Sequence, residues 1–227
     1  MRWIIKMLTS SLGKKLLMSL TGLFLISFLT IHLIGNLSIF KGDDGVSFNA
    51  YAAFMSTNPL IGAVSYLLYA GILLHVFVAI TLYFQNKSAR PVTYKEQQGS
   101  ANSAWESRSM TLLGILILAF LFIHLKDFWW QYKHDGGYVF TTDAEGNRDI
   151  YALVIEQFRT PFALVSYLIG LVALFLHLKH GFWSAFQTLG LDHEKYTPLI
   201  KALGLIYAIV VPLGFATMPV LVFFNII

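Results

Sequence analysis

The sequence predicts an all-α integral membrane protein built as a bundle of five transmembrane helices. Of its 227 residues, 56% are hydrophobic and 12% are charged, which is about half the charged fraction of a typical soluble domain. The apolar residues fall into five blocks of about 20 to 25 residues, and a helix of about 20 residues crosses a hydrocarbon core about 30 Å thick. Helices are expected because every backbone polar group in lipid needs an internal partner.

The first two spans are predicted at about 16–40 and 60–84, within a single membrane domain that covers the whole chain. The first span follows a basic N-terminal segment, and its apolar run is too long for the core of a cleaved signal peptide. Pro59 stands at the start of the second span, where a missing N–H is harmless. The polar segment that follows contains Pro91 and Gly99, which indicate a loop.

The last three spans are predicted at about 110–131, 161–184 and 200–224. Pro161 and Pro198 stand near the starts of the fourth and fifth spans. Pro212 and Pro219 fall inside the fifth span and are expected to kink it. Between the third and fourth spans, residues 138–154 alternate around a Gly-Asn turn, which predicts a short hairpin.

The charged residues predict the orientation of the bundle. One side carries most of the basic residues, and by the positive-inside rule this side, with the N-terminus, is cytoplasmic, while the C-terminus is outside. No nucleic-acid binding is expected, because the basic residues lie at the ends of spans. The chain has no cysteine, so disulfides, iron–sulfur ligation and thiolate chemistry are excluded. The basic residues assigned to the cytoplasmic side are Arg2, Lys6, Lys14, Lys15, Lys87, Arg90, Lys95, Arg108, Lys179, Lys195 and Lys201.

Four of the five predicted spans carry one histidine deep in apolar sequence: His32, His75, His124 and His177. Each follows the start of its helix by 16 or 17 residues, which corresponds to about 24 Å along the axis. Because successive helices run in opposite directions, equal offsets give two levels in the membrane. His32 and His124 are expected near the outer third. His75 and His177 are expected near the inner third.

Two imidazoles at each level suit two bis-histidine haems stacked across the membrane. Neutral imidazole is a strong ligand for iron, and a porphyrin fills the middle of a four-helix bundle. With both axial positions taken by protein, electron transfer is the expected task. A single histidine in a span could instead hydrogen-bond a neighbouring helix. Zinc transport is disfavoured, because the levels lack the carboxylates that usually join histidine along such a path.

Several further residues qualify this interpretation. His180 lies one turn beyond His177, near the inner boundary; it is either an interfacial residue, an alternative ligand or a contact to a haem propionate. Glycines near the ligands would let the porphyrin ring approach the helix backbone closely. These glycines are Gly35, Gly71, Gly114 and Gly181.

The stretches MSLTGLFLISFLTIHLIGNL and HLKHGFWSAFQTLG, with the contexts of His75, His124 and His177, resemble the cytochrome b membrane-anchor subunit of succinate dehydrogenases and fumarate reductases. The resemblance is to the bacterial five-helix, di-haem, single-anchor type, and it extends from about Lys14 to the fifth span. It implies an anchor in the bacterial cytoplasmic membrane, beneath a flavoprotein subunit and an iron–sulfur subunit on the cytoplasmic face. Electrons would pass between the iron–sulfur clusters and a quinone, commonly menaquinone, through two haem b groups.

The resemblance also implies roles for individual residues. His75 and His177 would hold the inner haem, and His32 and His124 the outer haem. Ser19, in the SLTG motif, matches a position that contacts a propionate of the inner haem. The quinone would bind near the outer haem, with its contacts left open. The chain would not oxidise succinate alone, because it contains no visible flavin or dicarboxylate site.

The sequence departs from the family pattern at two places. Some members carry a glutamate two residues before the fourth-span ligand, where this chain has Phe175. Some have an acid near the start of the second span, where this chain has Phe48 and Asn49. The proton route and the quinone contacts of those members are therefore not carried over.

Two alternative functions stay open. One is the di-haem anchor of another quinone-linked oxidoreductase, of the formate dehydrogenase or nitrate reductase type. Those bundles often place two ligands on one span, whereas this chain has one on each of four consecutive spans. The other is a haem-free membrane carrier.

Overall fold

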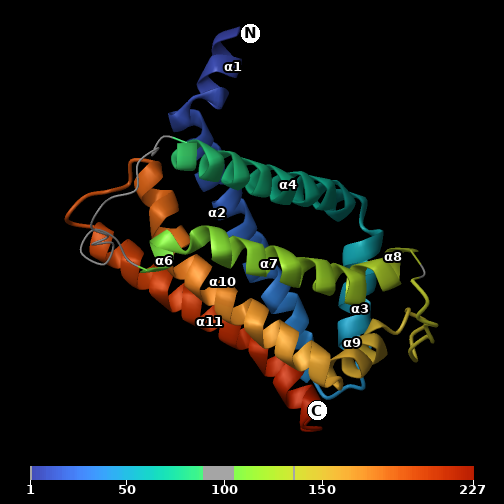
Figure 1. The fold of residues 1–227 in the computed structure, drawn as a ribbon. Coiled ribbons are helices and arrows are strands. Elements are labelled where there is room, and N and C mark those ends of the chain that lie inside the picture. The colour runs from blue at the N-terminus through green and yellow to red at the C-terminus, as the bar shows by residue number, and fades with distance from the viewer. Residues whose placement is uncertain (1, 89–104, 135) are drawn as a thin grey trace.

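The computed structural model describes residues 2–88, 105–134 and 136–227, which are largely helical (Figure 1). Five helical stretches in this part of the chain are long and apolar enough to cross a membrane, so the predicted all-α fold with five span-length apolar helices is confirmed. The stretches are Ser11–Phe40, Pro59–Ser88, Met110–His134, Pro161–Thr188 and Thr197–Phe223. Their helices are α2 (Ser11–Asn36) with η1 (Leu37–Phe40), α4 (Pro59–Ser88), α7 (Met110–His124) with η2 (Leu125–Trp130) and α8 (Gln131–His134), α10 (Pro161–Thr188) and α11 (Thr197–Phe223).

Side-chain caps fix where several helices begin. The Ser10 hydroxyl accepts a hydrogen bond from the Gly13 N–H (3.0 Å) at the start of α2. The Thr160 hydroxyl accepts one from the Ala163 N–H (3.2 Å) at the start of α10, where Pro161 occupies the first turn. Each cap satisfies one of the backbone donors left free at a helix N-terminus, which typically stabilises the helix by about 1 kcal/mol.

The short hairpin predicted for residues 138–154 forms only around its turn, and the residues from Ile150 onward are helical instead. A tight turn does form at Gly146, with φ +83, but the pairing stops at a single antiparallel bridge between Thr142 and Arg148. The chain then enters helix α9 (Ile150–Phe158), because Asp149 caps its N-terminus and the helix buries one apolar face. The polar loop predicted after the second span lies mostly outside the described residues, and α11 stays helical through Pro212 and Pro219.

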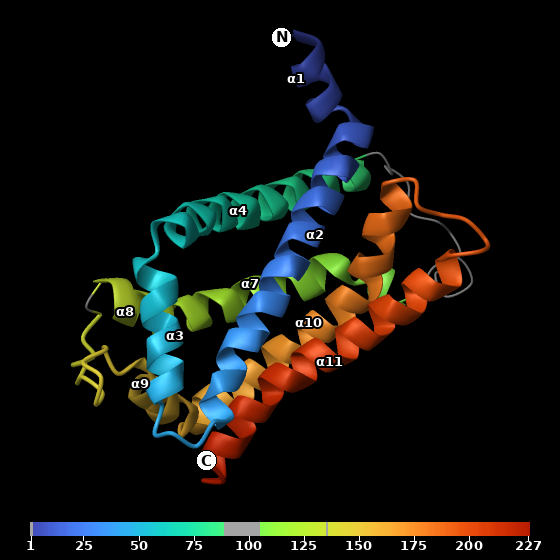
Figure 2. The ribbon, with the colours of Figure 1, turned by 180° about the vertical axis from the view of Figure 1, so that it is seen from behind.

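The four helices that carry the histidines are brought together around α2 and α10 (Figures 1 and 2). α10 packs against α7, α2 and α11, while α4 packs against α2 and α3 (Val46–Thr57). Helices α3, α8 and α9 gather at the end that holds the C-terminus, and α1 (Arg2–Thr9) extends from the opposite end. α11, which carries no histidine, lies against α10 and α2.

Burial is uneven across the bundle. The core cluster lies at the end with α3 and α9, and includes Leu33, Phe48, Phe158 and Tyr167. By contrast, α4 buries Val78 alone among its 30 residues.

Candidate functional site

The structure brings the four histidines together as two couples. We call His32 and His124 the outer pair. Their ring centroids are 5.8 Å apart, with the ring planes at 84°. His32 lies in the last turns of α2 and is stacked on Phe28 (5.2 Å), while His124 is the last residue of α7. Rings from two different helices thus meet at one level of the bundle.

We call His75 and His177 the inner pair. Their ring centroids are 6.3 Å apart, with the ring planes at 64°. His75 comes from α4 and His177 from α10, and both rings are half-buried. The ring that meets His75 is that of His177, while His180 lies one turn further along α10.

The spacing of contacts along α2 separates the two pairs. Thr21 on α2 touches His75 of the inner pair, and His32 on the same helix belongs to the outer pair. The two contacts are eleven positions apart in the sequence, which corresponds to about 16 Å along the helix axis. The pairs are therefore at two distinct levels rather than in one cluster.

Hydroxyl groups lie at the Nδ1 atoms of two of the rings and can favour one tautomer. Thr21 Oγ1 donates to the Leu17 carbonyl (2.7 Å), so its lone pair can accept from His75 Nδ1 at 3.0 Å. The Tyr167 hydroxyl donates to Asp127 (3.3 Å) and lies 3.5 Å from His124 Nδ1, so it can accept there. In both histidines the proton belongs on Nδ1, which leaves the Nε2 lone pair for a ligand.

The other two rings are held differently. The side-chain nitrogen of Asn36 lies 3.3 Å from His32 Nδ1 and donates to the His32 carbonyl (2.7 Å). Binding of a metal by His32 Nε2 would require the Asn36 amide to turn, because Nδ1 would then carry the proton. His177 Nδ1 is buried without a hydrogen-bond partner among the described residues. A buried unsatisfied nitrogen costs roughly 1–3 kcal/mol, and such costs concentrate at functional sites.

The donor sets fit a metal that brings its own equatorial ligands. No group of three or more His, Cys, Asp or Glu that could hold a bare ion is found in the described part of the chain. A protein site for zinc needs three or four such ligands, whereas a haem needs two axial ones. Each pair therefore offers the number of imidazoles that a haem would take from the protein.

Ser19 and the glycines near the ligands have the following surroundings. Ser19 is buried on α2 and donates to the Lys15 carbonyl (3.1 Å), so its propionate contact stays a prediction, as does any role for His180. The Tyr51 ring fills the space where a side chain at Gly35 would lie, and the Phe24 ring does so at Gly71. A Cβ added at Gly114 or Gly181 would meet no atom within 4 Å. The glycine next to a ligand is Gly22, where an added Cβ would lie 3.6 Å from His75 Cε1, and it was not predicted.

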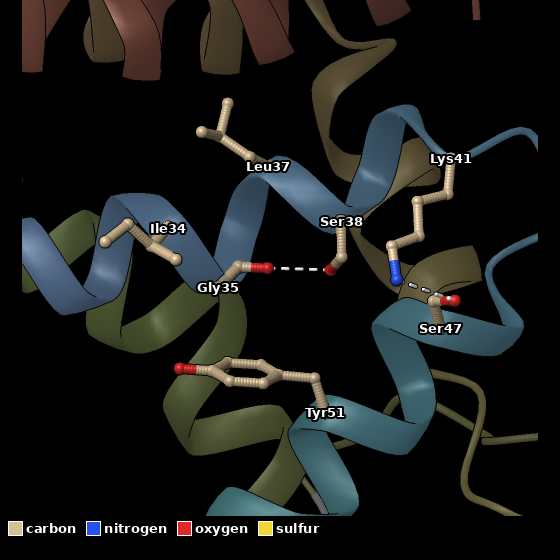
Figure 3. A pocket seen from close by; sticks show the side chains of 7 residues that line it. All are labelled: Ile34, Gly35, Leu37, Ser38, Lys41, Ser47 and Tyr51. Carbon is tan, nitrogen blue, oxygen red and sulfur yellow. Dashed lines mark hydrogen bonds between the residues drawn. The ribbon is translucent and has the colours of Figure 1, made fainter.

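A pocket of about 340 Å³ lies beyond the outer pair, between the end of α2, η1 and α3 (Figure 3). It includes Gly35, three residues after His32, and its polar side chains are Ser38, Lys41, Ser47 and Tyr51. Lys41 donates to Ser47 (3.3 Å) across the pocket. Tyr51 lies outside the spans, and burial raises its pKa, so its hydroxyl remains a hydrogen-bond donor at neutral pH.

Sequence reasoning missed the residues that support the rings. Asn36 and Asp127 follow His32 and His124 by four and three positions, so helical spacing alone places them on the ligand faces. Thr21 and Tyr167 come from other helices, and no local pattern identifies them. Comparison with protein-family models, with curated proteins and with solved structures finds no match to this chain.

Proposed function

We propose that the chain is the di-haem b membrane anchor of a succinate:quinone oxidoreductase, relaying electrons between an iron–sulfur subunit and a membrane quinone. The observation that supports this proposal is the meeting of four histidines from four helices as two couples, about 16 Å apart along α2. When bound, haem iron exchanges one electron at a time, so each pair would form one station of a relay. Thr21 and Tyr167 hold the ring protons on Nδ1 and so present Nε2 to the iron.

In this proposal the end with α1 faces the cytoplasm and the end with α3 and α9 faces outside. The flavoprotein and iron–sulfur subunits would dock at the cytoplasmic end, close to the inner pair. The membrane would be the bacterial cytoplasmic membrane, and the basic residues near the ends of α2 and α4, including Lys14, Lys15 and Lys87, would lie on the same side as these partners.

The quinone, menaquinone in this proposal, would bind in the pocket beyond the outer pair. The volume of about 340 Å³ is within the usual range of small-molecule sites. Lys41 and Tyr51 can donate hydrogen bonds to the two carbonyl oxygens of a quinone head, and Ile34 and Leu37 supply apolar walls. The outer pair is the nearer of the two couples, since Gly35 follows His32 within one helical turn.

The test is purification of the chain with whatever subunits accompany it, followed by reduced-minus-oxidised spectra and quantification of haem. We expect b-type absorption with two haems per chain, and about half of it should be lost in each of His75→Ala and His124→Ala. Colourless material would refute the proposal, and transport activity impaired by His75→Ala in such material would favour a carrier. The co-purifying subunits distinguish a succinate-type complex from the formate dehydrogenase and nitrate reductase types.

A further inference from the structure

Asp127 is a buried carboxylate that the proposed relay does not use. It is 5% exposed and is the one charged side chain of the buried class among the described residues. An isolated ionised carboxylate in an apolar interior is strongly disfavoured, so a buried one needs partners. One oxygen lies 3.6 Å from the ammonium of Lys126, whose side chain is exposed. The other oxygen turns inward.

The inward-facing oxygen of Asp127 is connected to the outer pair through the hydroxyl group of Tyr167. Tyr167 on α10 donates to Asp127 Oδ2 (3.3 Å), and the same hydroxyl lies 3.5 Å from His124 Nδ1. A phenol has one proton, and when the carboxylate takes that hydrogen bond, the oxygen can only accept from the ring. Asp127, Tyr167 and His124 therefore form a directed chain from a carboxylate to a histidine of the outer pair.

The backbone that carries Asp127 departs from the regular α-helix, and departures of this kind are common at functional sites. Directly after His124 the helix widens into the π-helical segment η2, which contains Asp127. Single π-helical turns inside long helices are rare and occur frequently at functional sites. This observation concerns the backbone and is independent of the side-chain contacts.

Aromatic side chains enclose the phenol. The rings of Phe120, Phe128 and Phe158 lie 5.1, 6.1 and 5.1 Å from the Tyr167 ring, and Tyr167 is 4% exposed. Such an enclosure excludes water and strengthens polar contacts inside it. The phenol is thus held in one place between its two partners.

The inner pair has a different environment. His75 Nδ1 meets the neutral hydroxyl of Thr21, and His177 Nδ1 has no partner among the described residues. The described contacts of the inner pair include no carboxylate. Among the contacts of the described residues, the outer pair alone is connected to a carboxylate.

We propose that Asp127 and Tyr167 are positioning residues for His124, which fix its ring and tune the centre that the outer pair would hold. This inference rests on the proposed haem binding. A hydrogen bond from Nδ1–H toward a carboxylate raises the basicity of the ligand and stabilises the oxidised metal. Removing either residue should therefore raise the midpoint potential of the outer centre and leave the inner centre unchanged.

The test is a spectroelectrochemical titration of the purified full-length chain, in the complex in which it is isolated. The variants are Tyr167→Phe and Asp127→Asn, which remove one hydroxyl or one charge with little change of volume. We expect one of the two midpoint potentials to shift upward in each, and it should be the one that is lost in His124→Ala. Asp127→Glu should restore it in part. Thr21→Val, the matched change at the inner pair, should shift the other potential.

The outcomes separate this inference from the proposed function. A wild-type preparation without haem refutes the proposed function. Two haems with unchanged potentials in Asp127→Asn and Tyr167→Phe, or equal shifts of both centres, refute the inference alone, and so does lowered thermal stability without a selective shift. Selective loss of the outer haem, with retention weakened about tenfold or more, supports it. If either Asp127→Asn or Tyr167→Phe does not accumulate in cells, the midpoint potentials of the other variant test the inference.

Discussion

The hydroxyl of Thr21 lies 3.0 Å from His75 Nδ1, and its own proton is donated to the Leu17 carbonyl. With the hydroxyl proton on that carbonyl, the oxygen can accept the Nδ1 proton of His75 and leave Nε2 free. Three of the four histidines have a polar neighbour at Nδ1, and each neighbour is chemically different: a threonine hydroxyl at His75, a tyrosine hydroxyl at His124 and a donating amide nitrogen at His32. The supports of the two pairs are therefore separable by single substitutions.

Thr21→Val should weaken haem retention at the inner pair by about tenfold, which is the low end of the effect of losing a ligand's outer hydrogen bond. Valine keeps the shape of threonine and removes the acceptor. The measurement is haem content after prolonged detergent washing. Thr21→Ser retains the hydroxyl and should behave like the wild type. Equal haem loss in the two variants would contradict the assigned role.

Gly170→Ala should destabilise the bundle by about 1–3 kcal/mol, because an added Cβ would overlap the Phe120 side chain in the interface between α10 and α7. Phe120 packs on His124 with centroids 5.8 Å apart, so the outer pair should be disturbed as well. Thermal unfolding in detergent measures the first effect and the spectrum of the outer haem the second. Gly62→Ala is the control, because a Cβ at Gly62 meets nothing within 4 Å. Equal melting temperatures in the two variants would rule out the predicted overlap.

Lys41→Gln and Tyr51→Phe should each raise KM for the quinone roughly tenfold with little change in kcat, since each removes a donor to a carbonyl oxygen. Steady-state reduction of a soluble quinone by the complex measures this. Lys133→Gln removes a lysine from helix α8, at the same end of the bundle but away from the pocket, and should leave KM unchanged. A fall in kcat alone would place the quinone elsewhere.

Asp43 should contribute a pH-dependent term to stability. Ser47 hydrogen-bonds its carboxylate, with the Ser47 N–H at 3.0 Å, and this lowers the pKa of Asp43 below its usual value. A depressed pKa stabilises the fold fully above the unfolded value of about 3.9, and the contribution is lost as the pH falls through the lower folded value. Melting temperatures between pH 7 and pH 3 should therefore fall less steeply in Asp43→Asn than in the wild type. Identical slopes in the wild type and Asp43→Asn would refute the contribution.

Much of the fold follows from the sequence, because the signals that define it are local. Each of the five apolar blocks is long enough to cross the hydrocarbon core as a helix, which predicts five spans. Because successive helices run in opposite directions, His32 and His124 are placed at one level and His75 and His177 at another. Residues 138–154 mark the limit of this reasoning, because the predicted hairpin forms only around its turn. A short alternating segment is ambiguous, and there the cap at Asp149 and the burial of one face of α9 decided for a helix.

The sequence by itself determined the number of span-length helices, the position of each histidine along its helix and the neighbours of His32 and His124 on their own helices. Only the tertiary structure decided that the rings at each level face one another, that Thr21 and Tyr167 support them, and that a pocket forms where Tyr51 covers Gly35. The physical reason is that the rise per residue is a property of one helix. The rotation of each helix about its axis, and its choice of neighbours, depend on how side chains such as Phe120 pack against Gly170 on another helix.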